Sequence, residues 1–104
     1  MDYYDRVKQL KELASYDNSG GYEVDTGGIY LDEKDSAKPF RLITASGCSC
    51  WDGDFTEDEF ATLEDLEKSL NSDLPHRYNP SINTGKWLIE EAGRKLKESF
   101  EANK

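Results

Sequence analysis

The feature that most limits how this chain can fold is an acidic segment at residues 52–73. It holds nine acidic residues and one basic residue, Lys68, and so carries −8 of the total net charge of −9. Apolar residues recur through it at helical spacing, at Phe60, Leu63, Leu66 and Leu70. This periodicity predicts an amphipathic helix that buries the apolar stripe and leaves the acids facing solvent.

The residues before that stripe predict where the helix begins. Thr56 and Glu59 have the spacing of a capping box, in which each side chain accepts a hydrogen bond from a backbone N–H of the first turn. Phe55 and Phe60 are placed to pack against each other as a hydrophobic staple. We therefore expect the helix to begin at Thr56.

The composition predicts one globular domain over residues 1–104. The chain is 36% hydrophobic and 34% charged, and its two tryptophans, six tyrosines and four phenylalanines are too many for a disordered acidic tail. A fold of this length buries roughly two-thirds of the surface that its unfolded form exposes. One modest core is therefore feasible.

The first third of the chain predicts a helix followed by a β-hairpin. Asp2 can cap a helix whose apolar residues share one face, at Tyr3, Val7, Leu10 and Ala14. Turn-forming residues at 17–21 end it. Residues 22–25 and 29–31 look extended and flank Gly27-Gly28, which tolerates positive φ, so we expect two strands joined by a turn there.

The remaining segments complete a predicted α+β fold. After a charged loop at 32–39, residues 40–45 predict a third strand, which residues 48–51 continue or follow as a fourth short strand. Prolines indicate a loop at 71–83, and Thr84 is expected to cap a last helix that buries Trp87, Leu88, Ala92, Leu96 and Phe100. The predicted fold is a small antiparallel β-sheet of three to four strands packed against an N-terminal helix and two C-terminal helices.

Charge and hydropathy narrow the classes of partner. The N-terminal residues lack the basic start and apolar run of a signal peptide, and no segment approaches the ~20 apolar residues of a membrane span. We expect a cytoplasmic protein that does not contact membrane. Net negative charge repels nucleic acid phosphates, so direct nucleic acid binding is not expected. A basic surface of another protein is the partner that this charge attracts.

The two cysteines, Cys48 and Cys50, leave an alternative open. In a strand their side chains would point to the same face, and a disulfide between such close neighbours would be strained. A zinc site would need His76 together with Asp52 or Asp54, in a spacing that matches no known zinc motif. We expect no metal or cofactor, and the alternative is a small metal- or thiol-dependent protein using Cys48, Cys50 and His76.

Residues 46–53, Ser-Gly-Cys-Ser-Cys-Trp-Asp-Gly, resemble a stretch of uncharacterised small acidic proteins of bacteriophage type. Those proteins carry a similar Gly-Cys-Ser-Cys followed by Trp and an acid, and the resemblance covers this stretch alone. It implies a protein of the host cytoplasm that inhibits a host defence protein, such as a CRISPR or restriction effector, by imitating the charge of DNA. It carries over no catalytic residue.

Together these observations predict a protein-binding module rather than an enzyme, one that docks its acidic face on a basic surface of a nucleic-acid-binding protein. The predicted partner-binding residues are Trp51, Asp52, Asp54, Glu57, Asp58, Glu64, Asp65 and Glu67. Trp51 is either a core residue, the interpretation that we favour, or an aromatic residue at the rim of a binding site, and acidic runs are often merely solvated helix faces. A further alternative is a structural or self-assembly module that uses its tyrosines, among them Tyr3, Tyr4, Tyr16, Tyr30 and Tyr78; the sequence leaves the oligomeric state open.

Overall fold

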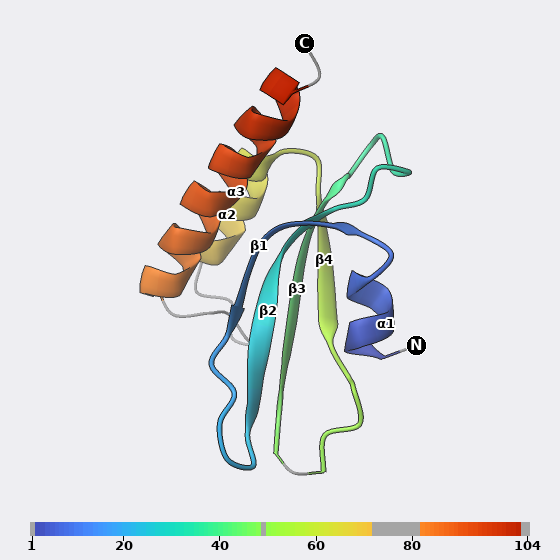
Figure 1. Ribbon diagram of the computed structural model, residues 1–104, viewed down its shortest axis with the longest axis vertical. Coiled ribbons are helices and arrows are strands. Elements are labelled where there is room, and N and C mark those ends of the chain that lie inside the picture. The colour runs from blue at the N-terminus through green and yellow to red at the C-terminus, as the bar shows by residue number, and fades with distance from the viewer. Residues whose placement is uncertain (1, 49, 72–81, 103–104) are drawn as a thin grey trace.

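The computed structural model describes residues 2–48, 50–71 and 82–102, and it confirms the α+β class (Figure 1). One antiparallel sheet has the strand order β1-β2-β3-β4. The strands are β1 (Lys11–Asp17), β2 (Val24–Leu31), β3 (Phe40–Gly47) and β4 (Thr56–Phe60). The short helix α1 (Tyr3–Val7) covers one face, and α2 (Leu63–Asn71) and α3 (Ile82–Ala102) cover the other.

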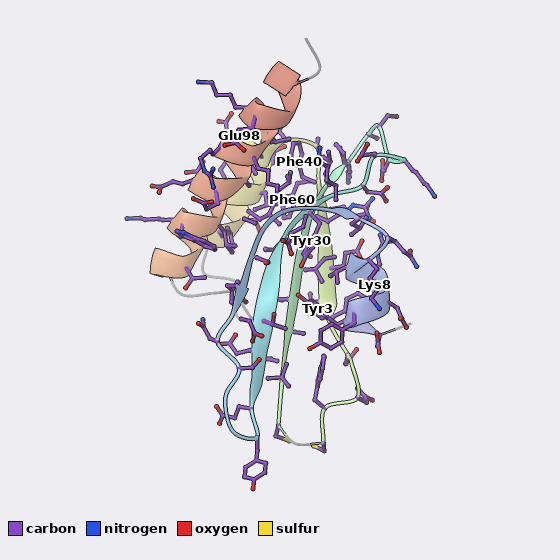
Figure 2. All side chains as sticks on the ribbon, in the orientation of Figure 1. Tyr3, Lys8, Tyr30, Phe40, Phe60 and Glu98 are labelled. Carbon is purple, nitrogen blue, oxygen red and sulfur yellow. The ribbon has the colours of Figure 1, made fainter. Side chains whose placement is uncertain are left out.

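The sheet separates two apolar clusters. Side chains alternate along each strand, so Ile29 and Leu42, which are paired in the register, point to α2 and α3, whereas Ile43 points to α1. The larger cluster contains Leu13, Ala14, Ile29, Leu42, Leu66, Leu88 and Ala92. The smaller one contains Tyr3, Tyr30, Ile43 and Ala45. Figure 2 shows Phe40 and Phe60 close to the helices and Tyr3 on the side of α1.

The first helix is much shorter than predicted. Asp2 caps it as expected, since its Oδ1 accepts a hydrogen bond from the N–H of Asp5 at 2.9 Å. Residues 11–17 are nevertheless a strand, and a β-bulge between Glu12 and Ala14 turns both Leu13 and Ala14 into the larger cluster. Because Leu13 and Ala14 both face the core, the apolar residues of this segment have the spacing of a helix, which explains why a longer helix was predicted.

The predicted turn at Gly27-Gly28 is also wrong. Both glycines lie in the middle of β2 and are buried. A Cβ on Gly28 would lie 2.4 Å from the backbone oxygen of Ala14, so a glycine is needed because β1 passes too close for any side chain. The hairpin turn lies at residues 18–23, between β1 and β2.

The predicted helix start at Thr56 is wrong. Residues 56–60 form β4, which pairs with β3 in the register Thr44↔Thr56 to Phe40↔Phe60. The helix begins at Leu63, where the N–H of Asp65 donates to Thr62 Oγ1 at 3.1 Å. The apolar stripe still reaches the core as expected, with Phe60 arriving from a strand and Leu63, Leu66 and Leu70 from the helix.

The last helix, α3, begins before Thr84 and not at it. Leu88 and Ala92 are fully buried as predicted, whereas Trp87 is 46% exposed. Residues 72–81, within the predicted loop, and the side chain of Phe100 lie outside the described residues. The predicted strand at 48–51 is wrong at the described residues 48, 50 and 51, which lie outside β3 and β4, and the N–H of Trp51 donates to the Cys48 carbonyl. Within the described ranges, no helix is long and apolar enough to cross a membrane.

Candidate protein-binding site

The acidic residues predicted to share one face are divided by the sheet. Asp52 and Asp54 lie in the loop that leads into β4, Glu57 and Asp58 lie on β4, and three others lie on α2: Glu64, Asp65 and Glu67. Because α2 packs on the face opposite α1, its acidic residues lie across the sheet from the loop beside α1. Asp73 lies outside the described residues.

Glu57 is held in an ion-pair network and is not free to meet a partner. Its carboxylate accepts two hydrogen bonds from Arg6, at 2.6 and 2.7 Å, and one from Arg41 Nη1 at 2.7 Å. The Arg6 hydrogen bonds, aided by Arg41 and opposed by burial, hold the pKa of Glu57 below its usual range. This side chain therefore joins α1 to the sheet.

Arg41 is the buried centre of that network. Its side chain is only 5% exposed, and its Nη2 donates to Asp35 Oδ2 at 2.6 Å while its Nε donates to the Lys38 carbonyl. Burial opposes its charge, but Glu57, Glu59 and Asp32 more than compensate and raise its pKa. The network stabilises the fold and leaves this part of the acidic segment locally neutralised.

Two of the other predicted partner-binding residues, Glu64 on α2 and Asp58 on β4, are less available to a partner than predicted. Glu64 lies 3.6 Å from Lys68 on the same helix, an exposed pair. Asp58 is half-buried and lies opposite Leu42 in the register, on the side of the sheet that faces α2. Asp65 and Glu67 are exposed, and they form no ion pair with any described residue.

The loop before β4 is fixed to the start of α1. The N–H of Tyr3 donates to the Gly53 carbonyl at 2.8 Å. Gly53 has φ +96°, and a Cβ there would lie 2.4 Å from the Cβ of Asp2, so only glycine allows this approach. Asp52 and Asp54, on either side of it, are exposed and form no ion pair within the described part of the chain.

Three aromatic rings lie beside those two carboxylates. The Trp51 ring centroid is 6.4 Å from that of Tyr3 and 5.9 Å from that of Tyr4. Trp51 is half-buried against the smaller cluster, and its Nε1 donates to the Asp54 carbonyl at 2.9 Å. It therefore belongs partly to the core and partly to the surface. Tyr4 is 53% exposed, so much of its ring is accessible to a partner.

On its other side, Tyr4 borders a groove of about 340 Å³ between α1 and the first two strands. The groove is also lined by residues of three elements: Tyr3 and Val7 of α1, Glu12, Ser15, Tyr16 and Asp17 of β1, and Thr26 and Tyr30 of β2. At its inner wall the hydroxyls of Tyr3 and Tyr30 lie 3.4 Å apart. The groove is of a size that suits a single side chain or small ligand.

The groove is electrostatically negative. Burial, a hydrogen bond with Tyr3 and the charge of Glu12 raise the pKa of Tyr30, so its hydroxyl stays neutral. Hydrogen bonds from Ser19 lower the pKa of Asp17, which keeps that carboxylate charged. Among the described lining residues, Glu12 and Asp17 are the charged ones. Carboxylates beside aromatic rings are suited to a cation.

We call the combination of Tyr4, Trp51, Asp52, Asp54 and this groove the α1-side surface. Sequence reasoning identified Trp51 and the two aspartates but missed Glu12 and Asp17. These two were assigned to a helix and a turn, whereas the strand register places Glu12 opposite Tyr30 and Asp17 opposite Thr26. The basic residue Lys8 lies at the C-terminal end of α1, away from the loop that contains Asp52 and Asp54 (Figure 2).

The predicted metal alternative gains no support from the geometry. Cys48 and Cys50 are exposed and unbridged, and His76 lies outside the described residues. Within the described ranges, no group of three or more His, Cys, Asp or Glu side chains could hold a metal ion.

Comparison with family models, curated proteins and solved structures finds no match to this chain. Function has therefore to be inferred from the residues themselves.

Proposed function

We propose that this chain is a protein-binding module whose α1-side surface docks on a basic patch of another protein. The observation that supports this most directly is the adjacency of the exposed Tyr4 ring and the half-buried Trp51 ring to Asp52 and Asp54, two exposed carboxylates that form no ion pair with any described residue. Aromatic side chains are enriched at the centres of interfaces. Carboxylates around them would speed the encounter with a cationic partner and orient it.

The groove adds a place for one side chain of that partner. An arginine fits its chemistry, since a guanidinium can stack on the Tyr4 ring while donating hydrogen bonds to Glu12. Lysine would make the charge contact but has no planar group to stack. The proposed partner therefore presents arginine on an exposed basic surface.

Exposed basic surfaces that present arginine, as proposed for the partner, are typical of proteins that bind nucleic acid phosphates. The resemblance of residues 46–53 to phage proteins favours a host defence protein that acts on nucleic acid, with both proteins in the host cytoplasm. By occupying the arginines that would contact phosphates, the bound chain would act as an inhibitor. The proposed role involves no catalysis by this chain.

Binding of a short fluorescent polyarginine peptide, followed by anisotropy, tests the surface with a defined ligand. Exposed ion pairs contribute up to about 1 kcal/mol each, so D52N/D54N is expected to weaken binding by between fivefold and about thirtyfold. Binding by the unaltered protein should also weaken as salt rises from about 50 mM to 300 mM. The substitution E12Q should weaken binding of polyarginine and polylysine peptides alike, whereas Y4A should reduce the preference for arginine because it removes the ring on which a guanidinium stacks.

The matched control is D65N/E67Q, which removes the same amount of charge from α2 on the opposite face of the sheet. It should leave binding within about twofold, because the effect of exposed charges is local at physiological salt. Equal losses in the two double variants would show that only net charge matters and would contradict docking by the α1-side surface. Proteins captured from the native cell and eluted by salt would then be tested against the same pair of variants.

A further inference from the structure

The two cysteines of this chain lie in the connection between β3 and β4, next to Trp51. Both thiols are exposed to solvent, and their Sγ atoms are 2.7 Å apart, in direct contact. One residue separates them, so they remain close whatever the rest of the molecule does. Neither the packing of the core nor the proposed docking accounts for an exposed pair of thiols in this arrangement.

The contact makes the two thiols unequal. A hydrogen bond with the Cys50 thiol, in which either sulfur can be the donor, and one from the Cys50 backbone N–H lower the pKa of Cys48. A lower pKa increases the fraction of thiolate near neutral pH, and the thiolate is the form that attacks a disulfide. Cys48 is therefore the attacking sulfur, and Cys50 is placed to resolve the product.

We propose that Cys48 and Cys50 form a redox-active dithiol that exchanges reversibly with glutathione disulfide. In the first step the Cys48 thiolate attacks one sulfur of glutathione disulfide, which forms a mixed disulfide and releases one glutathione thiolate. In the second step the Cys50 thiolate attacks the Cys48 sulfur, closes the Cys48–Cys50 bond and releases the second glutathione. Two protein thiols are oxidised, one glutathione disulfide is reduced, and the two thiol protons pass to the released glutathiones.

Formation of the Cys48–Cys50 bond would change the position of Trp51. The backbone N–H of Trp51 donates to the Cys48 carbonyl at 2.9 Å, so the backbone that the new bond would constrain also positions Trp51. The indole covers Gly47, where a Cβ would lie 2.9 Å from Trp51 Cδ1. Because the indole also contacts Tyr3 and Tyr4, a shift of the turn would reach the α1-side surface.

A disulfide between residues this close is strained, and strain makes a disulfide easier to reduce. The pair is therefore expected to stay reduced under ordinary cytosolic conditions and to close when glutathione disulfide accumulates. The chemistry at the sulfurs requires only this protein and glutathione disulfide and does not depend on the proposed docking.

The test incubates the reduced protein in buffers of increasing glutathione disulfide content, followed by acid quenching, alkylation and measurement of intact mass. The unaltered chain is expected to change from two alkylated cysteines to none, with no glutathione attached. The variant C50S should stop at the mixed disulfide, with one glutathione bound to Cys48. Failure to form an intrachain bond at any ratio, or formation of linked dimers in its place, would overturn the proposal.

The role of Cys50 as hydrogen-bond donor has its own test. Serine keeps a donor at position 50 and alanine does not, so Cys48 should react faster with glutathione disulfide in C50S than in C50A. Equal rates would overturn the assignment of Cys50 as the activating group.

Coupling to Trp51 is read from fluorescence in a W87F background, where Trp51 is the one tryptophan left. Its emission should change on oxidation in that chain and not in one that also carries C48S and C50S. Disulfide formation without a change in emission would overturn the link to the aromatic cluster.

Discussion

Replacing Glu57 by glutamine is expected to lower the free energy of unfolding by about 3 kcal/mol. The substitution keeps the shape of the side chain but removes the charge that faces both Arg6 and Arg41. Arg41 is nearly inaccessible to solvent, and it would keep Asp35 at 2.6 Å and Asp32 at 3.5 Å but lose the carboxylate that accepts from its Nη1 at 2.7 Å. A buried cation with too little compensation is the costly outcome of breaking such a network.

Glu59 provides the matched control, since it lies on the same strand and also approaches Arg41. Its side chain is 53% exposed and 3.8 Å from Arg41 Nη1, so E59Q should change stability by less than about 0.5 kcal/mol. Urea denaturation of the three proteins near neutral pH measures the differences. Similar losses in E57Q and E59Q would mean that the network responds to total charge and not to the buried contact.

The pH dependence of the effect follows from the lowered pKa of Glu57. Because Arg6 and Arg41 favour the carboxylate in the folded state, the stabilisation is complete above the unfolded pKa of about 4.3. It is lost as the pH falls through the lower, folded-state pKa. The stability difference between the unaltered protein and E57Q should therefore shrink in acid, and a difference that stays constant down to about pH 3 would contradict this.

Replacing Gly28 by alanine is expected to cost about 3 kcal/mol, or to prevent folding altogether. The added Cβ would lie 2.4 Å from the backbone oxygen of Ala14 and 2.9 Å from the Cα of Ser15. Neither atom belongs to a flexible side chain, so β1 and β2 would have to separate at the Ser15↔Gly28 pair. Thermal unfolding followed by circular dichroism would detect the loss.

Gly20 is the control for the same substitution. It lies in the turn between β1 and β2, and a Cβ there would meet no atom within 4 Å. Alanine also restricts the unfolded chain more than glycine does, so G20A is expected to leave stability unchanged or raise it by up to about 1 kcal/mol. If G28A were as stable as G20A, the close approach of β1 to Gly28 would be wrong.

The fold class could be predicted because it depends on which segments are buried, and the buried segments were identified even where the type of element was wrong. The apolar stripe from Phe60 to Leu70 reaches the core whether its first member comes from a strand or a helix. The strand at residues 40–45 was predicted correctly because it is rich in branched and aromatic residues, which are favoured in strands. Enough such segments were identified to require a sheet covered by helices.

The errors arose where distant residues determine the local structure. Thr56 and Glu59 have the spacing of a helix cap, but pairing with β3 aligns Glu57 with Ile43 and brings its carboxylate to Arg41 and Arg6, which lie far away in sequence. Tertiary contacts of that kind override a local capping preference. The same holds for Gly28, because the close backbone that requires a glycine there belongs to the neighbouring strand β1.

The candidate site was only partly predictable for the same reason. Asp52 and Asp54 could be named from charge alone, and the structure leaves them exposed. The prediction that they share one face with Glu64 and Asp65 required a helix that does not exist in residues 56–60. Glu12 and Tyr30 could have been brought together only by the correct strand register.

The position of β4 has a consequence for how copies of this protein meet one another. In the described part of the chain β4 is the outermost strand on its side of the sheet, and three of its five residues are acidic. An outer strand offers free backbone groups to any other strand, and like charges along it resist pairing with a second copy of itself. Because Arg6 and Arg41 neutralise Glu57, the exposed Glu59 is the acidic residue of β4 that most opposes such pairing between molecules.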